Sequence, residues 1–293
     1  MNLLVKFSPE LAAWMMHNLD RGCVPVDLVQ AMLEQGFEPS VAAGLVEAVV
    51  AARAGGATLP AGEVEIAVED VDYVVEPPRL PAGPVIRTFD RDVMVALRAR
   101  RPALAVLHGV LSPDECAEFI AAARGRLRPS TVVDPATGRD VVAAHRSSEG
   151  LFFLPAETPF VARIERRLAE LMNVPLAHGE GLQLLHYAPG AGSEPHYDFL
   201  SPTNDANAAS LARSGQRVAS LVMYLNDVER GGETVFPELG LAVVPRAGHA
   251  VHFEYANSRG QVDLHSVHAA AKVEAGEKWV LTKWVRERAF VPA

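Results

Sequence analysis

The sequence predicts an α+β protein with a jelly-roll-type β core, flanking helices and a small all-α module at its N-terminus. Two amphipathic segments begin at Ser112 and Thr158, each followed by proline, and Glu115 completes a capping box in the first of them. Short runs of strand composition then follow at residues 182–188, 218–225, 233–237, 241–244, 250–255 and 279–285. Helices followed by many short strands are typical of an α+β domain with a jelly-roll core.

The predicted N-terminal module comprises residues 1–55. Ser8 and Pro9 have the residue types of a helix N-cap and a first helical position. Apolar residues at 26–33 recur at helical spacing, Gly36 ends that segment, and a further helix starts at Pro39. We therefore expect three short helices that act as a helical cap or as a dimerisation element, for which a homodimer would be the assembly.

Residues 56–84 are rich in Gly and Pro and acidic in their middle, which predicts a linker with at most one strand. The domain that carries the chemistry is then expected at 85–293, with its core at 180–288. No motif residue precedes the linker. We therefore expect the helical module to affect substrate choice or assembly and not the chemistry.

Composition excludes several classes of protein. The chain has 293 residues, 49% of them hydrophobic, and a net charge of −9, which disfavours a nucleic-acid partner. Its two cysteines, Cys23 and Cys116, lie far apart and suggest neither a disulfide framework nor a metal site. The first twenty residues lack the basic region of a signal peptide, and we find no membrane-spanning run. We therefore expect a cytoplasmic protein without a membrane partner.

The stretch SEPHYDF, residues 193–199, places an imidazole and a carboxylate two positions apart. Side chains at i and i+2 of a β-strand point to the same face, so His196 and Asp198 are expected to converge on one point. A third ligand must come from a distant strand, and the candidates are His249, His252, His265 and His268. His268 is favoured because Lys278 follows it by ten positions, on the next apolar run.

Two histidines and one carboxylate form the facial triad of non-haem Fe(II) oxygenases, which leaves coordination positions open. The ammonium group of a nearby lysine can pair with the far carboxylate of 2-oxoglutarate, because it acts as a point charge for an anion. The other histidines have simpler interpretations: His249 and His252 lie in an apolar strand, and His265 lacks the lysine spacing.

At this point the sequence can be compared with a known family. Residues 128–286 resemble the catalytic domain of prolyl 4-hydroxylases, which are 2-oxoglutarate- and Fe(II)-dependent dioxygenases. The matching stretches, in order, are STVVDPATGRDV, HRSSEGLFF, GEGLQLLHYAPGAGSEPHYDF, GQRVASLVMYLNDVERGGETVFPELGLAVVPRAGHAVHFEY and HSVHAAAKVEAGEKWVLTKWVRER. The resemblance implies a double-stranded β-helix that uses Fe(II), 2-oxoglutarate, O2 and ascorbate. It also implies hydroxylation at C4 of a prolyl residue in a peptide or protein, with succinate and CO2 as co-products.

The resemblance assigns roles position by position. The positions that match the iron ligands are His196, Asp198 and His268. The positions that match contacts with the distal carboxylate of 2-oxoglutarate are Lys278, Tyr187 and Thr234. The positions that match the peptide-binding side are Arg217 and Trp284, and Arg146 matches a motif bordering the substrate loop.

The sequence departs from the family pattern beside the distal histidine. Ala271 and Lys272 stand where the family usually has a small residue and then a Cys-Pro pair, which could alter the substrate range. Residues 200–215, between the His196/Asp198 pair and Arg217, form a long segment that we expect to act as a lid. Three alternatives share these residues: a hydroxylase of another residue or of a free amino acid, a non-catalytic binding module, and a nucleic-acid demethylase. The intact co-substrate positions disfavour the second, and the acidic charge disfavours the third.

Overall fold

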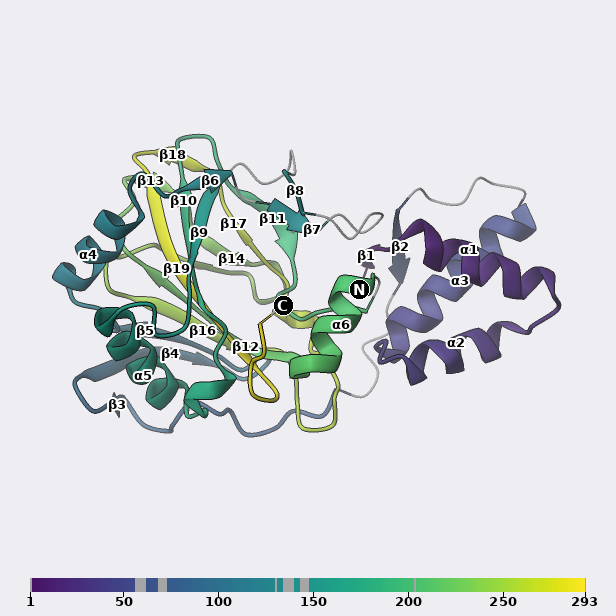
Figure 1. The fold of residues 1–293 in the computed structure, drawn as a ribbon, viewed down its shortest axis with the longest axis horizontal. Coiled ribbons are helices and arrows are strands. Elements are labelled where there is room, and N and C mark those ends of the chain that lie inside the picture. The colour runs from purple at the N-terminus through teal and green to yellow at the C-terminus, as the bar shows by residue number, and fades with distance from the viewer. Residues whose placement is uncertain are drawn as a thin grey trace. The chain divides into compact units, whose positions relative to one another are not determined.

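The computed structural model describes residues 2–55, 62–67, 73–129, 131–133, 140–142, 148–202 and 204–292. The chain divides into two compact units, drawn as ribbons in Figure 1. The smaller unit comprises 1–73 with 132–141 and 200–213, and the larger one comprises 74–131, 142–199 and 214–293. Over the described ranges, no helix has both the length and the apolar character that a membrane span requires.

Three helices lie between two strands in the smaller unit. The order is β1 (Asn2–Lys6), α1 (Pro9–Asp20), α2 (Pro25–Glu34), α3 (Pro39–Gly55) and β2 (Glu63–Ala67). The Ser8 hydroxyl accepts a hydrogen bond from the Leu11 amide at 3.2 Å, and each helix begins at a proline. Gly36 follows α2 with a φ of 88°, a left-handed conformation that glycine adopts without a steric penalty. The predicted three-helix pattern is therefore confirmed.

The prediction that this module is all-α is wrong, because β1 and β2 form an antiparallel pair. Each strand has five residues, too few for a clear periodic signal, and the two strands come from opposite ends of the module. Ile66 of β2 packs closely against α3: a Cβ atom added to Gly44 would lie 2.8 Å from Ile66 Cδ1. Part of the segment that we predicted as a linker is thus a strand packed on the helices.

The larger unit contains a nine-stranded and a four-stranded sheet, both antiparallel in every described pairing. The nine-stranded sheet has the order β3 (Val85–Arg87), β4 (Asp92–Ala99), β5 (Leu104–His108), β16 (Ala250–Glu254), β12 (Arg217–Tyr224), β19 (Lys278–Arg286), β10 (Leu182–Tyr187), β9 (Glu149–Phe153) and β6 (Arg128–Pro129). The four-stranded sheet has the order β11 (Ser193–His196), β17 (His268–Ala270), β14 (Thr234–Phe236) and β15 (Leu241–Val243). The larger unit also contains the pair of β13 (Arg230–Gly231) with β18 (Val273–Ala275), whereas the pair of β7 (Thr131–Val133) with β8 (Asp140–Val142) falls mostly within residues 132–141 of the smaller unit.

The two large sheets face each other across an aromatic core (Figure 1). The ring of Phe253 on β16 lies 5.1 Å from that of Phe236 on β14, measured between centroids. It also lies 4.6 Å from the ring of His268 on β17. Such contacts hold the sheets together as the predicted double-stranded β-helix. All six predicted strands are confirmed, as β10, β12, β14, β15, β16 and β19.

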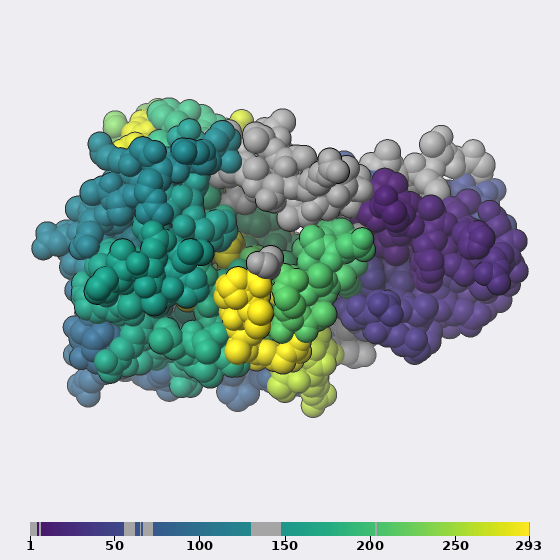
Figure 2. All heavy atoms as spheres, viewed as in Figure 1, coloured from purple at the N-terminus to yellow at the C-terminus, as the bar shows by residue number. Residues whose placement is uncertain are grey.

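Helices α4 (Pro113–Ala123) and α5 (Pro159–Met172) cover the outer face of the nine-stranded sheet, and their side chains hide the strands in Figure 2. The predicted capping box is present, since Ser112 and Glu115 exchange hydrogen bonds of 2.9 and 3.1 Å. Phe119 of α4 packs against Phe153 of β9 with ring centroids 5.5 Å apart. The remaining described helices are α6 (Asp205–Ser214), which forms within the predicted lid segment, and the short turns η1 (Leu176–His178), η2 (Pro237–Leu239) and η3 (Leu264–Ser266).

Residues 74–84, the end of the predicted linker, are hydrogen-bonded to the larger unit. The Val74 amide donates to Gln261 Oε1 at 3.2 Å. Arg79 pairs with the buried Glu254 at 2.9 Å and donates to it from its backbone amide at 2.7 Å. The described part of the predicted linker is therefore ordered at both ends, with 63–67 in the smaller unit and 74–84 in the larger.

A buried ion cluster joins α5 to α4 and to the turn before β4. The guanidinium group of Arg167, which is fully buried, donates to both carboxylate oxygens of Glu115 at 2.7 Å and to those of Asp90 at 2.6 and 2.9 Å. Burial is the largest single effect and opposes ionisation of Glu115, but the hydrogen bonds and charge of Arg167, together with hydrogen bonds from Ser112 and Arg163, outweigh it and lower the pKa of Glu115 to about 2. Burying charges in pairs of this kind offsets much of the desolvation cost that a lone buried charge would carry.

Replacing Arg167 by Met should lower the free energy of unfolding by about 3 kcal/mol, because it removes the buried partner of Glu115 and Asp90 and leaves Glu115 only the more exposed Arg163 and Arg91. Urea denaturation at pH 7 measures this change. Arg230→Met, which breaks an exposed pair with Glu274, should cost less than about 1 kcal/mol. Since the folded pKa of Glu115 is depressed below its usual 4.5, its contribution is present above pH 4.5 and is lost as the pH falls toward about 2. Equal effects of the two substitutions would contradict the structural role of the cluster.

Candidate active site

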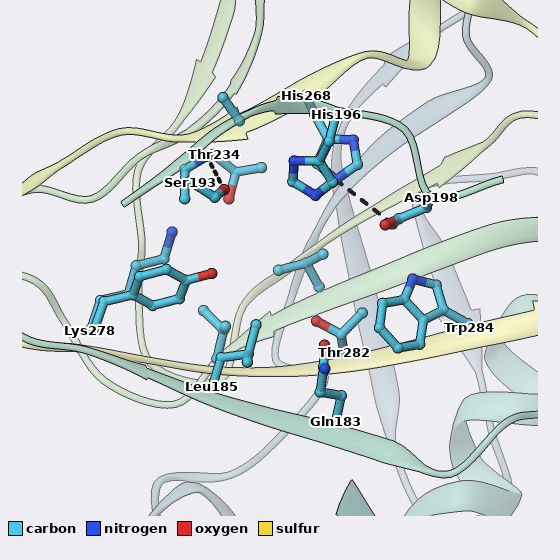
Figure 3. A pocket seen from close by; sticks show the side chains of 15 residues that line it. Gln183, Leu185, Ser193, His196, Asp198, Thr234, His268, Lys278, Thr282 and Trp284 are labelled. Atoms are coloured by element: carbon cyan, nitrogen blue, oxygen red, sulfur yellow. Dashed lines mark hydrogen bonds and ion pairs between the residues drawn. The ribbon is translucent and has the colours of Figure 1, made fainter. Parts of the chain in front are cut away.

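His196, Asp198 and His268 converge at one end of the four-stranded sheet. His196 ends β11 and lies opposite His268, the first residue of β17, with ring centroids 4.4 Å apart. We predicted that His196 and Asp198 share a strand, but β11 ends at His196 and Asp198 lies in the bend that follows. Asp198 still turns toward the histidines, and its Oδ2 lies 3.6 Å from His268 Nε2 (Figure 3).

Backbone carbonyls orient both imidazoles. His196 Nδ1 lies 2.8 Å from the carbonyl oxygen of Glu194, and His268 Nδ1 lies 3.1 Å from that of Ser266. A carbonyl only accepts hydrogen bonds, so Nδ1 carries the proton in each ring, and Nε2 presents a lone pair. This is the usual arrangement of histidines that bind a metal ion.

Asp198 is buried, and a hydrogen-bonded chain fixes its carboxylate. Ser220 of β12 donates to Asp198 Oδ2 at 2.6 Å, and the Ser220 hydroxyl lies 3.0 Å from the Tyr255 hydroxyl. Burial opposes the negative charge, but His268 and His196 outweigh it and lower the pKa of Asp198 to about 2. The carboxylate is therefore ionised at neutral pH and can act as a ligand.

The donor atoms of the three residues fit a divalent metal ion. One atom from each residue lies within 4.8 Å of the others, and no other group of three His, Cys, Asp or Glu in the described ranges does so. Two neutral imidazole nitrogens and one carboxylate oxygen are the donor set of non-haem Fe(II) oxygenases. The three residues that the sequence selected are thus brought together, whereas His249, His252 and His265 lie outside this group.

A pocket of about 450 Å³ opens beside the triad. Its floor is built from alternate residues of β10 and β19, two adjacent strands of the nine-stranded sheet. The register places Tyr187 opposite Lys278 and Gln183 opposite Thr282. Because strand side chains alternate between faces, these residues all point into the pocket, together with Trp284. Gln183 and Thr282 lie across from the two histidines in Figure 3.

Lys278 is a buried cation at the end of the pocket away from Trp284 (Figure 3). Its Nζ lies 5.4 Å from the ring centroid of Tyr187 and 5.8 Å from that of Tyr224. Burial lowers the pKa of Lys278 to about 8, with a smaller opposing effect from Glu233. Within the described ranges, no carboxylate forms an ion pair with it. A cation in this state is suited to binding an anionic group.

Thr234 also lines this end of the pocket and is held by a residue that the sequence did not single out. The Tyr224 hydroxyl donates to Thr234 Oγ1 at 2.8 Å, and both side chains are buried. Thr234 can then donate its own hydroxyl proton to a bound ligand. The predicted residues Tyr187, Thr234 and Lys278 therefore occupy one end of the pocket together.

Arg217 lies beside the pocket and not in its lining. Its guanidinium carbon lies 3.9 Å from the ring centroid of Trp284, and Nη1 lies 3.4 Å from the Asp198 carbonyl oxygen. Glu180 holds the guanidinium in a bidentate pair of 2.8 and 2.9 Å and also accepts from Arg286 at 3.0 Å. Glu180 and Arg286 were not predicted, because each acquires its role only through contacts between distant segments.

Phe152 of β9 extends this face outward. It lies opposite Gln183 in the sheet, is half exposed, and its ring centroid is 6.4 Å from that of Trp284. Within the described part of the chain, Gln183 Oε1 and Trp284 Nε1 are buried without a hydrogen-bond partner. Aromatic rings, together with polar atoms that lack a hydrogen-bond partner among the described residues, thus line the way from the protein surface to the pocket. Arg146, the last predicted site residue, lies outside the described residues.

The chain is similar to known proteins over this region. The sequence model of the 2OG-Fe(II) oxygenase superfamily matches residues 182–286. Prolyl 4-hydroxylase 1 of Arabidopsis thaliana is 41% identical over 203 residues, which cover 64% of this chain and 70% of that protein. Prolyl 4-hydroxylase subunit alpha-1 of Gallus gallus is 34% identical over 211 residues, which cover 72% of this chain and 39% of that protein.

A solved structure is similar as well. The 2OG complex of a viral collagen prolyl hydroxylase from Paramecium Bursaria Chlorella virus-1 has 27% sequence identity and a TM-score of 0.49, covering 62% of this chain and 95% of that chain. The identity to the Arabidopsis protein, over most of that protein's length, settles the kinship. The chain belongs to the prolyl 4-hydroxylase family of the 2OG-Fe(II) oxygenase superfamily.

Proposed function

We propose that this protein is a 2-oxoglutarate- and Fe(II)-dependent dioxygenase that hydroxylates C4 of a prolyl residue in a peptide or protein. The observation that carries the proposal is one pocket with an oriented His–Asp–His group at its wall and, at its end, a buried lysine that has no ion-pair partner among the described residues. The names of the relatives, prolyl 4-hydroxylases, support the choice of proline over another residue or a free amino acid.

In this proposal His196, Asp198 and His268 hold Fe(II) through Nε2, a carboxylate oxygen and Nε2. When bound, Fe(II) with 2-oxoglutarate and O2 supplies oxidative decarboxylation to succinate and CO2, coupled to insertion of one oxygen atom into a C–H bond. Ascorbate is the reductant that we expect to keep the iron ferrous. The main-chain carbonyls of Glu194 and Ser266 keep the two histidine ligands in place.

Lys278 would pair with the distal carboxylate of 2-oxoglutarate, and Thr234 and Tyr187 would donate hydrogen bonds to it. The support is burial and charge: Lys278 is 2% exposed, and in the described ranges it faces two aromatic rings and no paired carboxylate. Binding of an anion would supply the missing partner and raise the lysine pKa again.

The substrate would lie on the Trp284 side. Arg217, stacked on Trp284, and the half-exposed Phe152 offer flat surfaces against which a proline ring can pack. Among the described residues, the Trp284 Nε1–H is available to donate to a carbonyl group of a peptide backbone, and Gln183 Oε1 is available to accept from a backbone N–H. A prolyl residue has no N–H, so hydrogen-bond donors suit it. We also keep Arg146 as a substrate-loop residue, on the resemblance alone.

We further propose that residues 1–55 form a separate module, joined through 56–84 to the domain at 85–293, and that the module affects substrate choice or homodimer assembly. The division into two compact units supports a separate module, although 74–84 pack with the larger unit. Two free cysteines are consistent with a reducing cytoplasm, and the net charge of −9 with a peptide partner over a nucleic acid.

The proposed activity predicts succinate release that depends on a proline-containing peptide. Across a panel of such peptides, mass spectrometry should detect a gain of about 16 Da on proline, and His268→Ala should abolish both products. His265→Ala should retain them, since His265 is outside the triad. Product from free proline but from no peptide would favour a free amino acid substrate. No succinate under any condition would indicate a binding module.

Lys278→Ala should weaken 2-oxoglutarate binding by 100-fold or more, about 3 kcal/mol, because a buried carboxylate loses its cation. In the wild type, affinity should be constant below pH 8 and fall by about tenfold per pH unit above it, as the free enzyme loses the lysine proton. Lys278→Arg keeps a charge at high pH, so its affinity should be lower but flat across this range. A wild-type profile that stays flat to pH 10 would disprove the assignment.

Deletion of residues 1–73 should leave a folded larger unit that binds 2-oxoglutarate with wild-type affinity. The reason is that the pocket and the contacts of residues 74–84 all lie within 74–293. Size-exclusion chromatography and kinetics on a protein substrate should show a changed assembly or a higher KM. An insoluble product would mean that the helices belong to the core of the catalytic domain.

A further inference from the structure

Asp263 is a buried carboxylate that no part of the proposed chemistry uses. Its side chain is 1% exposed, and it precedes the turn η3, which leads directly into His268. Asp263 Oδ1 accepts from the His265 amide at 3.1 Å and so caps the turn. Its backbone carbonyl accepts from the Ser266 hydroxyl at 2.7 Å. Asp263 therefore contacts the second and third residues of the three-residue turn.

The η3 turn orients the imidazole of His268. The carbonyl oxygen that holds His268 Nδ1 belongs to Ser266, whose hydroxyl and amide both donate to the Asp263 carbonyl, at 2.7 and 3.1 Å. Any rotation of the turn would move this carbonyl, and with it the direction of His268 Nε2. A short chain of hydrogen bonds thus runs from the main-chain carbonyl of Asp263 to the imidazole, and the Asp263 carboxylate supports this chain by capping the His265 amide within the same turn.

Two side chains lie against the Asp263 carboxylate. Arg101, from the turn between β4 and β5, approaches Asp263 Oδ1 with its Nε at 3.4 Å. His265 Nδ1 lies 3.3 Å from the same oxygen. The contact with His265 also explains why this histidine, only three positions from His268, stands apart from the triad. The Asp263 carboxylate therefore contacts His265, the alternative ligand, and also supports the turn that leads to His268.

The hydrogen bonds that fix Asp198 also lead back to Asp263. The Asp263 amide donates to the Tyr255 carbonyl oxygen at 2.8 Å. The Tyr255 hydroxyl lies 3.0 Å from that of Ser220, which donates to Asp198. The outer contacts of Asp198 and of His268 are thus joined through Tyr255 and Asp263. Residues that hydrogen-bond to metal ligands commonly change metal affinity by about 10- to 100-fold when they are replaced.

We propose that Asp263, held by Arg101, is a positioning residue that orients His268 toward the metal and keeps His265 away from it. The inference rests on the proposed role of His268 as an iron ligand. It assigns no chemistry to Asp263, whose effect reaches the metal only through the turn. Replacing Asp263 should therefore lower metal affinity by more than the accompanying loss of folding stability would explain.

The test measures Co(II) affinity, by chelator competition under anaerobic conditions, beside urea denaturation of the metal-free full-length protein. Asp263→Ala should weaken Co(II) binding by about 10- to 100-fold. Asp263→Asn should weaken it less, because the amide oxygen still caps the turn. Glu115→Gln is the matched control: it alters a buried carboxylate that is paired with Arg167, far from the triad in the hydrogen-bond network. It should lower stability and leave Co(II) affinity unchanged.

Unchanged Co(II) affinity in a folded Asp263→Ala protein would overturn the inference. Should that variant fail to fold, Asp263→Asn and Arg101→Met decide the matter: affinity within about threefold of wild type in both would overturn it equally. His268→Ala separates this outcome from a failure of the proposed function. If that variant binds Co(II) like the wild type, the metal site itself has been placed wrongly.

Discussion

Strand β19 is buried on both faces along all nine of its residues, and the larger unit depends on this constraint. One face carries Lys278, Thr282 and Trp284 into the pocket, and the other carries Lys283 to Glu165 under α5. A slip of one residue would exchange the two sets, placing the pocket residues under the helix. The packing of the outer helices therefore also determines which side chains reach the pocket, so fold stability and site composition cannot vary independently here.

Buried charges in the larger unit fall into two groups. Arg167, Arg286 and Lys283 each meet a carboxylate at 2.6–3.0 Å, and these pairs join segments that are distant in the sequence. Lys278 is as deeply buried but has no such partner among the described residues. A protein can hold a cation in this way only if the rest of the fold supplies the stability that desolvation removes. The contrast separates the charges that stabilise the structure from the one for which we propose a ligand-binding role.

The sequence predicted those features whose signal is local. The HxD spacing, the lysine after His268 and the apolar runs of β10, β12 and β19 each lie within a short stretch of sequence. It could not predict Ser220, Tyr255 or Glu180, because their partners lie at least 22 positions away and depend on strand register. The pairing of β1 with β2 could not be predicted either, because the two strands are distant in sequence and only the folded helices bring them together. The lid role expected for residues 200–215 stays a prediction, although a helix does form there.

The two histidines are oriented by main-chain carbonyls, and this has a consequence for which metal the site accepts. Main-chain anchors fix the direction of each lone pair but do not sense the size or electronic preference of the ion. Two imidazole nitrogens with one carboxylate oxygen follow the general order of divalent affinities, in which nickel, copper and zinc exceed ferrous iron. Discrimination among metals would then depend on the supply of each ion in the cell. Protein isolated in air is expected to carry a mixture of ions, so occupancy should be set by chelation and anaerobic reloading before any rate is compared.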